Sequence, residues 1–236
     1  MNNFNWKDPF LLSEQLNEEE KLVQQSAAQF ALKELSSRLQ AALNSGGIGR
    51  KGYQLIGQAG LFGVTLPHEF GGSNASHTSY GLIAREIERI DSGFRSILSV
   101  QSSLVMYPIF KFGSNLQKQT YLKKLGSGEL IGCFGLTEPE AGSDPAGMRT
   151  TAIKTADGYR INGSKTWISN ASIADIFIIW AKSEEDNGKI RGFIIERGTK
   201  GLQTNKIDGK LSMQSVDTGS ILSLIHISEP TRPNEI

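Results

Sequence analysis

The spacing of hydrophobic residues in the first half of the chain is typical of helices. Asn17 and Glu20 form a capping-box pattern, and apolar residues then recur every three or four positions until Gly46 and Gly47. Glycine is a poor helix former, so the two consecutive glycines are expected to end the run. We therefore predict one long amphipathic helix between Asn17 and Gly46.

Four further helices are expected before residue 130. Apolar stripes at helical spacing place them over residues 53–59, around residues 83–90, over residues 96–106, and from a Ser114 cap to Gly126. Pro108 has no amide hydrogen and is expected to end the third of these helices. Several short helices with apolar stripes must pack on one another, so residues 1–129 are predicted to form an all-α domain.

The pattern changes at residue 130, where Thr, Ile and Val become frequent. Strands are predicted over residues 130–136, 150–155, 159–168, 176–182, 191–196 and 202–207. Asp157 and Gly158 supply a hairpin turn between the second and third of these strands. Short turns without intervening helices predict an antiparallel sheet or barrel over residues 130–221, so the fold class is α+β.

Composition and charge narrow the choice of partner. The 236 residues are 38% hydrophobic, and 25 basic side chains nearly cancel 24 acidic ones. This balance argues against nucleic acid or an anionic membrane surface as a partner. One cysteine and three scattered histidines predict neither a disulfide nor a metal site. No secretory signal or Arg-rich transit segment is visible, so we expect a cytoplasmic protein in a bacterium and a mitochondrial-matrix protein in a eukaryote.

A glycine-rich motif in the helical half has the wrong context for its usual ligand. Residues 47–52 fit G-x-G-x-x-G, which in other proteins lets the backbone approach a dinucleotide pyrophosphate. Here a helical run precedes the motif and no βαβ unit surrounds it. An irregular loop between two helices is the better interpretation.

Two polar motifs in the second half are the strongest candidates for a ligand site. The first, residues 135–147, combines the Thr137 hydroxyl with Gly142, where backbone can approach a ligand closely. The second, residues 165–170, offers the flat Trp167 ring and the Ser169 hydroxyl. By chemistry alone, the first motif is as consistent with an Asx-type structural turn as with a ligand site. By residue type alone, Trp167 is better explained as a core residue.

These motifs resemble the two flavin-binding signatures of the acyl-CoA dehydrogenases. The likeness rests on Thr137-Glu138-Pro139 with Gly142-Ser143-Asp144, followed by Lys165-Thr166-Trp167-Ile168-Ser169-Asn170. Upstream, residues 85–96 and 99–106 resemble the glutaryl-CoA dehydrogenase branch of that family. The likeness extends from about residue 4 to residue 221 and is loosest around residues 44–52.

The resemblance implies that FAD binds between the strand domain and helices. The implied cofactor-binding residues are Phe134, Leu136, Thr137, Gly142, Ser143, Trp167, Ile168 and Ser169. Trp167 would pack against the isoalloxazine ring, a large flat apolar surface. The hydroxyls of Thr137 and Ser169 would hydrogen-bond the ring heteroatoms and so tune its acceptance of a hydride.

The resemblance also implies a substrate site built around Arg95. Arg95 would bind the distal carboxylate of a glutaryl group through two parallel hydrogen bonds, with Ser96 beside it and Ser143 near the thioester. An acyl chain without that carboxylate would leave the guanidinium desolvated and unpaired, so it should bind poorly. Glu88 could orient Arg95 if the helix were continuous, although residues 91–93 offer a break.

The family's catalytic base is a glutamate in a C-terminal helical domain, and no residue of this chain matches it. We therefore assign no catalytic residue and expect this chain alone to be inactive. In the full-length enzyme, the resemblance implies glutaryl-CoA oxidation with decarboxylation, electron-transfer flavoprotein as the acceptor, and a homotetramer. Two alternatives remain open: a dehydrogenase for another acyl group, and a non-catalytic acyl-CoA or partner-binding module.

The last fifteen residues depart from the family pattern. Residues 222–236 read Leu-Ser-Leu-Ile-His-Ile-Ser-Glu-Pro-Thr-Arg-Pro-Asn-Glu-Ile, where the resemblance predicts strands that close the middle domain. The stretch resembles translated sequencing-adapter read-through, so we expect a truncated gene product here rather than an evolved terminus. A normal stop codon after Ile236 in clean genomic reads would refute this expectation.

Overall fold

The computed structural model describes residues 4–6, 8–156 and 158–228, the last five by their backbone. The α-helices are α1 (Glu18–Phe30), α2 (Leu39–Ser45), α3 (Gly49–Gln58), α4 (His77–Glu88), α5 (Ser92–Ser99), α6 (Tyr107–Phe112) and α7 (Asn115–Gly126). Two π-helical segments, η2 (Ala31–Leu35) and η5 (Val100–Met106), lie between them, together with 3₁₀ turns η1 (Leu12–Glu14), η3 (Ser36–Arg38) and η4 (His68–Phe70). The strands are β1 (Gly132–Gly135), β2 (Thr151–Thr155), β3 (Gly158–Ser169), β4 (Ile176–Ser183), β5 (Lys189–Glu196), β6 (Leu202–Lys206) and β7 (Thr218–Ser228), and a 3₁₀ turn, η6 (Pro145–Gly147), precedes β2.

The predicted long helix forms as one helical run with changing hydrogen-bond patterns. Its capping box is confirmed: the Glu20 amide donates to Asn17 Oδ1 at 2.8 Å, and the Asn17 amide donates to the Glu20 carboxylate at 3.2 Å. The run passes from α1 through η2 and η3 into α2. It ends at Gly46, whose φ of 74° is the left-handed conformation that glycine adopts at little cost.

The prediction that Pro108 ends a helix was wrong. The helical run that starts at α5 continues through η5 into α6, with Pro108 in the first turn of α6. In η5 the Tyr107 amide donates to Ser102 O, five residues back. This wider turn replaces the regular pattern just before the proline, and the first turn of a helix tolerates a residue without an amide hydrogen.

The prediction of an all-α half followed by a β half is confirmed, but the sheet is mixed rather than antiparallel. The seven-stranded sheet has the order β1-β4-β2-β3-β7-β6, with β5 paired to β4. Strand β4 runs parallel to both β1 and β2, whereas the other pairings are antiparallel. Turn residues in the sequence indicate which strands follow one another along the chain, but not which strands pair in the sheet. The chain forms the β2–β3 hairpin first, and β4 then pairs with β1. No short sequence motif marks this crossover connection.

The hairpin of β2 and β3 is confirmed, with Thr155 opposite Gly158; Asp157 lies outside the described residues. Strand β7 was not among the predicted strands. It pairs with β3 on one side and β6 on the other, and so runs past residue 222 as far as Ser228. Residues 229–236 lie outside the described part of the chain.

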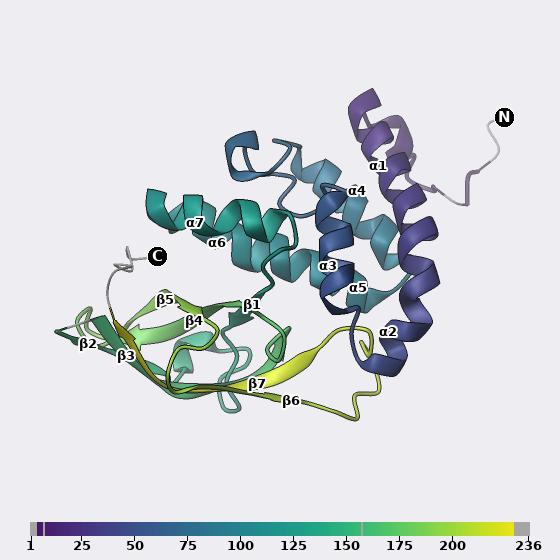
Figure 1. Cartoon of the computed structure of the whole chain (residues 1–236). Helices are drawn as coiled ribbons and strands as arrows, with labels where there is room; N and C mark the ends of the chain where they lie inside the picture. The colour runs from purple at the N-terminus through teal and green to yellow at the C-terminus, as the bar shows by residue number, and fades with distance from the viewer. Residues whose placement is uncertain (1–3, 7, 157, 229–236) are drawn as a thin grey trace.

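The helices form one layer that packs on the curled sheet (Figure 1). Gln101 of η5 fixes the start of β1: its side-chain oxygen accepts from the Gly132 amide at 2.9 Å, and its nitrogen donates to Leu130 O at 2.8 Å. The backbones approach so closely that a Cβ on Gly132 would lie 2.4 Å from the Val105 side chain. This contact sets the helices that carry Arg95 against the strand that leads to the first motif.

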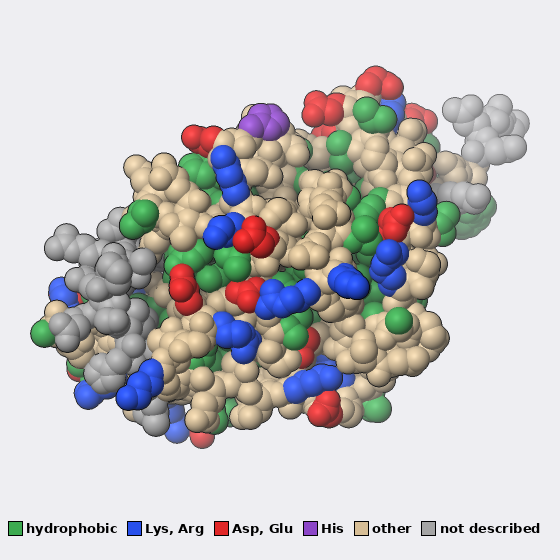
Figure 2. Space-filling view, in the orientation of Figure 1, with side chains coloured by type: hydrophobic (Ala, Val, Ile, Leu, Met, Phe, Trp, Pro, Cys, Tyr) green, Lys and Arg blue, Asp and Glu red, His purple; other side chains and the backbone are tan. Residues whose placement is uncertain are grey.

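No helix within the described residues is both long and apolar enough to cross a bilayer. Basic and acidic side chains are interspersed on the face shown in Figure 2. Cys133 is buried, and burial raises the pKa of its thiol well above the usual range. Cys133 therefore packs in the core as a small apolar residue.

Candidate flavin and acyl site

The two polar motifs lie side by side, as the resemblance requires. The Thr166 amide donates to Thr137 O at 2.9 Å, and the Lys165 ammonium donates to Leu136 O at 3.0 Å. Residues 136–137 are thereby held against the strand segment that leads directly into Trp167.

A buried ion pair supports the contact between the motifs. The Lys165 ammonium lies 2.8 Å from the Glu138 carboxylate, and the two side chains are only 2% and 5% exposed. The carboxylate also accepts from the Arg149 amide at 2.6 Å and from the amide and hydroxyl of Thr150. A buried charge with this many partners is stabilising only while all of them are present.

The ionisation of Glu138 reflects these contacts. Burial alone would raise the pKa of its carboxyl group. Hydrogen bonds from the Arg149 amide, the Lys165 ammonium and Thr150 outweigh the burial and lower the pKa from 4.5 to about 2. Glu138 is therefore a permanent anion near neutral pH, which suits a structural role rather than proton transfer.

The backbone turns Trp167 away from the core. The β3–β7 register shifts between Lys165 and Ile168, as in a β-bulge, and Trp167 has a φ of 59° in the left-handed region. The residue is 63% exposed. The reading of Trp167 as a core residue is therefore wrong, because the bulge re-aims the side chain to the surface.

An open pocket of about 470 Å³ lies beside the Trp167 ring. Ser169 and Thr218 line it from the sheet, and the segment from Ile207 to Val216 forms its other wall. Among the described residues, the hydroxyls of Thr137, Ser143 and Ser169 have no hydrogen-bond partner within the protein. Of these, Ser169 lines the pocket together with the exposed indole, a combination that fits a planar ligand with a polar edge.

The remaining cofactor positions differ in exposure. Phe134 and Leu136 are half-buried, and Phe134 makes an edge contact with Trp180 at 5.8 Å between ring centres. Ile168 lies in the hydrophobic core, so its side chain does not face solvent beside Trp167. Gly142 and Ser143 are exposed in the loop after Glu138. A Cβ on Gly142 would meet no atom within 4 Å, so no other part of the protein packs against the loop at Gly142.

Arg95 and Glu88 pair in spite of a break between their helices. Arg95 Nε donates to the Glu88 carboxylate at 2.8 Å, and Nη1 donates to the Ser99 hydroxyl at 3.2 Å. The Ser92 hydroxyl and Arg95 together lower the pKa of Glu88. Asp91 caps α5 and starts the new helix, so the pairing spans two helices rather than two turns of one.

The start of α5 contacts the wall of the Trp167 pocket. The Ser215 hydroxyl donates to the Asp91 carboxylate, and a Cβ on Gly93 would lie 2.1 Å from the Ser215 oxygen. Ser96, one turn further along α5, is buried, whereas Arg95 is 38% exposed at its side chain. The helix that carries the predicted substrate residues is thus anchored on the same segment, residues 207–217, that borders Trp167.

Sequence reasoning missed two sets of functional contacts. Glu138 and Lys165 were noted as motif members, but nothing in their spacing of 27 residues indicated that they pair. Asn170 was likewise noted without a role, although it proves to be fully buried and bonded to Tyr53. An acidic and a basic residue inside otherwise hydroxyl- and glycine-rich motifs were the available signals.

Comparison with known families decides what kind of site this is. The model of the acyl-CoA dehydrogenase N-terminal domain matches residues 17–129, and that of the acyl-CoA dehydrogenase middle domain matches residues 133–223. The chain belongs to the acyl-CoA dehydrogenase family. The helical layer of this acyl-CoA dehydrogenase chain is thus the N-terminal domain, and the sheet with both motifs is the middle domain.

Individual acyl-CoA dehydrogenases support the assignment. An acyl-CoA dehydrogenase of Bacillus subtilis is 41% identical over 175 residues, which are 72% of this chain and 46% of that protein. Glutaryl-CoA dehydrogenase of Mycobacterium smegmatis in complex with FADH2 is 35% identical, with a TM-score of 0.89 over 96% of this chain and 57% of that one. Butyryl-CoA dehydrogenase of Megasphaera elsdenii is 32% identical, with a TM-score of 0.83 over 93% and 58%. The chain spans about half the length of these relatives.

Proposed function

We propose that the full-length protein is an FAD-dependent acyl-CoA dehydrogenase whose FAD ring packs on Trp167. The observation that carries the proposal is the exposed indole that shares a pocket with Ser169, on a strand held at Thr166 against Thr137. The hydroxyls of Thr137 and Ser169 have no partner among the described residues. When bound, FAD would accept a hydride from the β-carbon of the acyl group. The hydroxyls of Thr137 and Ser169 would donate hydrogen bonds to the ring edge and hold it flat on the indole.

We further propose a dicarboxylic acyl-CoA, most simply glutaryl-CoA, as the substrate, with decarboxylation after oxidation. Arg95 supports this, because its side chain is 38% exposed and its guanidinium is already oriented by Glu88 and Ser99. Nη2, the remaining guanidinium nitrogen, makes no hydrogen bond to the described residues and could take up a carboxylate oxygen. Similarity alone does not select the substrate, since the glutaryl-CoA and butyryl-CoA relatives match almost equally well.

The other roles follow from the family resemblance and stay proposals. Ser96 would support the distal end of the acyl group and Ser143 the thioester end. Electron-transfer flavoprotein is the proposed acceptor and a homotetramer the proposed assembly. A dehydrogenase for another acyl group, or a module that binds acyl-CoA or a partner without catalysis, are the competing functions.

The substrate proposal is tested with Arg95→Ala in a full-length version. Loss of a charge-assisted bond should lower kcat/KM for glutaryl-CoA by about 10- to 100-fold and leave that for butyryl-CoA unchanged or higher. Arg38→Ala is the matched control, since Arg38 is also partly exposed (43%) and pairs with a glutamate, Glu34. A wild-type preference for butyryl-CoA would remove Arg95 from this role, and absence of turnover with a bound flavin would favour the binding module.

A further inference from the structure

Asn170 ends the second motif and is the point at which four segments meet. It is fully buried and has a φ of 71° in the left-handed region. It directly follows β3, three residues after Trp167. A buried amide side chain must find partners for both its oxygen and its nitrogen.

Each polar group of Asn170 binds a different element. The Tyr53 hydroxyl of α3 donates to Oδ1 at 2.5 Å, and Nδ2 donates to Gly132 O at the start of β1 at 2.9 Å. The main-chain amide donates to Asp217 O, next to β7, at 2.9 Å. One residue therefore ties β3 to the helical domain, to β1 and to the segment before β7.

We propose that Asn170 is a positioning residue, which fixes residues 167–169 relative to the helical domain and thereby sets the affinity for FAD. The consequence for FAD rests on the proposed function; the placement of the segment does not. Gly132 begins the strand that leads to Thr137, so the same side chain links both halves of the site. Tyr53 is itself immobilised, because it is fully buried and stacks on Phe62 with ring centres 5.9 Å apart.

Asparagine suits this position for two separate reasons. Its backbone adopts the left-handed conformation more readily than most residues. Its side chain also offers one acceptor for Tyr53 and one donor for Gly132. Removal of either partner would leave a buried polar atom unsatisfied, which costs more than the net value of the hydrogen bond.

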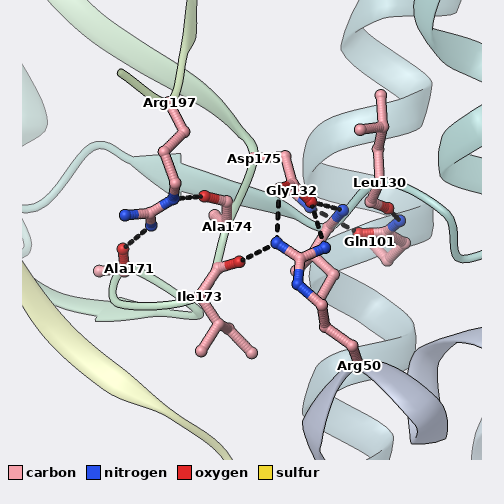
Figure 3. Close-up of polar contacts among 10 residues, drawn as sticks. Arg50, Gln101, Leu130, Gly132, Ala171, Ile173, Ala174, Asp175 and Arg197 are labelled. Atoms are coloured by element: carbon pink, nitrogen blue, oxygen red, sulfur yellow. Dashed lines mark hydrogen bonds and ion pairs between the residues drawn. The ribbon is translucent and has the colours of Figure 1, made fainter. Parts of the chain in front are cut away.

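Other contacts across the same boundary hold the neighbouring loop. The Arg50 guanidinium of α3 crosses the boundary to pair with the Asp175 carboxylate and to donate to Ile173 O (Figure 3). Arg197, which lies within the β half, holds the same loop from the other side through Ala171 O and Ala174 O. These residues follow Asn170, whereas Trp167–Ser169 precede it. The domain boundary thus has several ties, and Asn170 is the one that belongs to the motif itself.

Two variants and a matched control separate positioning from general stability. Asn170→Gly removes the side chain and keeps a residue for which a positive φ costs little. Tyr53→Phe removes only the hydroxyl that Asn170 accepts. Tyr121→Phe is the control, since the Tyr121 hydroxyl of α7 also crosses the domain boundary, to Glu196 of β5 at 2.8 Å, but does not contact the motif.

The first readout is amide hydrogen exchange in this chain, followed by mass spectrometry of peptides. In Tyr53→Phe, exchange over residues 166–170 should become about tenfold faster, because the loss of one buried hydrogen bond is worth about that factor. Asn170→Gly loses two such bonds, to Tyr53 and to Gly132, so exchange there should be accelerated at least as much. Exchange in β4 and β5 should stay at the wild-type rate in both. Tyr121→Phe should leave residues 166–170 unchanged. The proposal would be overturned if Asn170→Gly and Tyr53→Phe both fold and exchange residues 166–170 at the wild-type rate. It would also be overturned if exchange over these residues were accelerated equally in Asn170→Gly, Tyr53→Phe and Tyr121→Phe.

The second readout is the dissociation constant for FAD in a full-length version. Tyr53→Phe should weaken binding by about tenfold and Asn170→Gly by at least as much, since it also removes the bond to Gly132. Tyr53→Phe should have no further effect once Asn170 is glycine, because the acceptor of the Tyr53 hydroxyl is then gone. Additive losses, or wild-type affinity in both variants, would overturn the proposal. A wild-type protein that binds no FAD would instead refute the proposed function, while the exchange result would still decide the placement of the segment.

Discussion

At the scale of single residues, the site depends on groups that the protein holds in fixed charge states and directions. The Glu138–Lys165 pair is buried beneath both motifs, and it joins them through Leu136 O as well as through the carboxylate. Residue types in the motifs indicated hydroxyls and an aromatic ring but not this pair. Pairing across 27 residues depends on the tertiary fold, which no local spacing encodes.

The ionisation of Glu138 makes stability depend on acidity. Its pKa is about 2 in the folded protein and 4.5 ordinarily, so the carboxylate stabilises the fold above about pH 4.5 and this contribution disappears as the pH falls toward 2. Urea denaturation at pH 6 and pH 3 should show a loss of about 2 kcal/mol from this group, since at pH 3 the carboxyl group is still largely ionised in the folded protein. In Glu138→Gln the loss between these two pH values should be smaller by that amount; an unchanged pH dependence would contradict the prediction.

Replacing the partner tests the same pair at neutral pH. Lys165→Met would leave a buried carboxylate without its cation and should destabilise the protein by about 3–5 kcal/mol. Lys154→Met is the comparison, because Lys154 pairs with Glu185 at 2.7 Å but is 56% exposed, and exposed pairs contribute about 0–1 kcal/mol. Equal effects of the two substitutions in urea would show that burial of the pair does not matter.

At the scale of elements, local sequence predicted the helices and the hairpin but not the order of the sheet. Capping patterns at Asn17 and Ser114 are local signals and proved correct, since both capping boxes form. The parallel β1–β4 pairing and the π-helical η5 before Pro108 depend on what packs against them. The exposure of Trp167 could not be predicted from local sequence either, because a β-bulge is defined only by the pairing with the partner strand.

The close packing of η5 on β1 gives a test at this scale. In Gly132→Ala the new Cβ would lie 2.4 Å from Val105, and such overpacking should destabilise the protein by about 1–3 kcal/mol. Gly81→Ala is the control: Gly81 lies in α4, where a Cβ would meet nothing within 4 Å. That change should stabilise the protein by about 0.5–1 kcal/mol. A neutral Gly132→Ala in urea denaturation would mean that the two backbones can separate freely.

At the scale of the whole molecule, the two matched domains share one continuous boundary but span about half the length of their relatives. The pocket beside Trp167 is open, with walls supplied by the sheet and by residues 207–216. The family resemblance predicts which residues belong to this site, and that assignment stays a prediction. The sequence could not predict how enclosed the site is, because enclosure depends on segments distant in sequence.

An open pocket predicts weak retention of the cofactor. The purified 236-residue chain, loaded with FAD, should lose its yellow colour during gel filtration, because a planar ligand covered on one face exchanges readily with solvent. Absorbance of the protein peak near the flavin bands measures this directly. A stoichiometric flavin spectrum after gel filtration would contradict the prediction and would mean that these residues enclose the ring by themselves.

The exposed indole of Trp167 also gives the protein an intrinsic optical reporter. An aromatic ring that stacks on an excited indole quenches its emission, so arrival of the ligand would be visible without any label. The chain has three tryptophans, and replacing Trp6 and Trp180 by phenylalanine would leave the signal to the one at the pocket. Fluorescence could then follow the encounter in real time, before any turnover takes place.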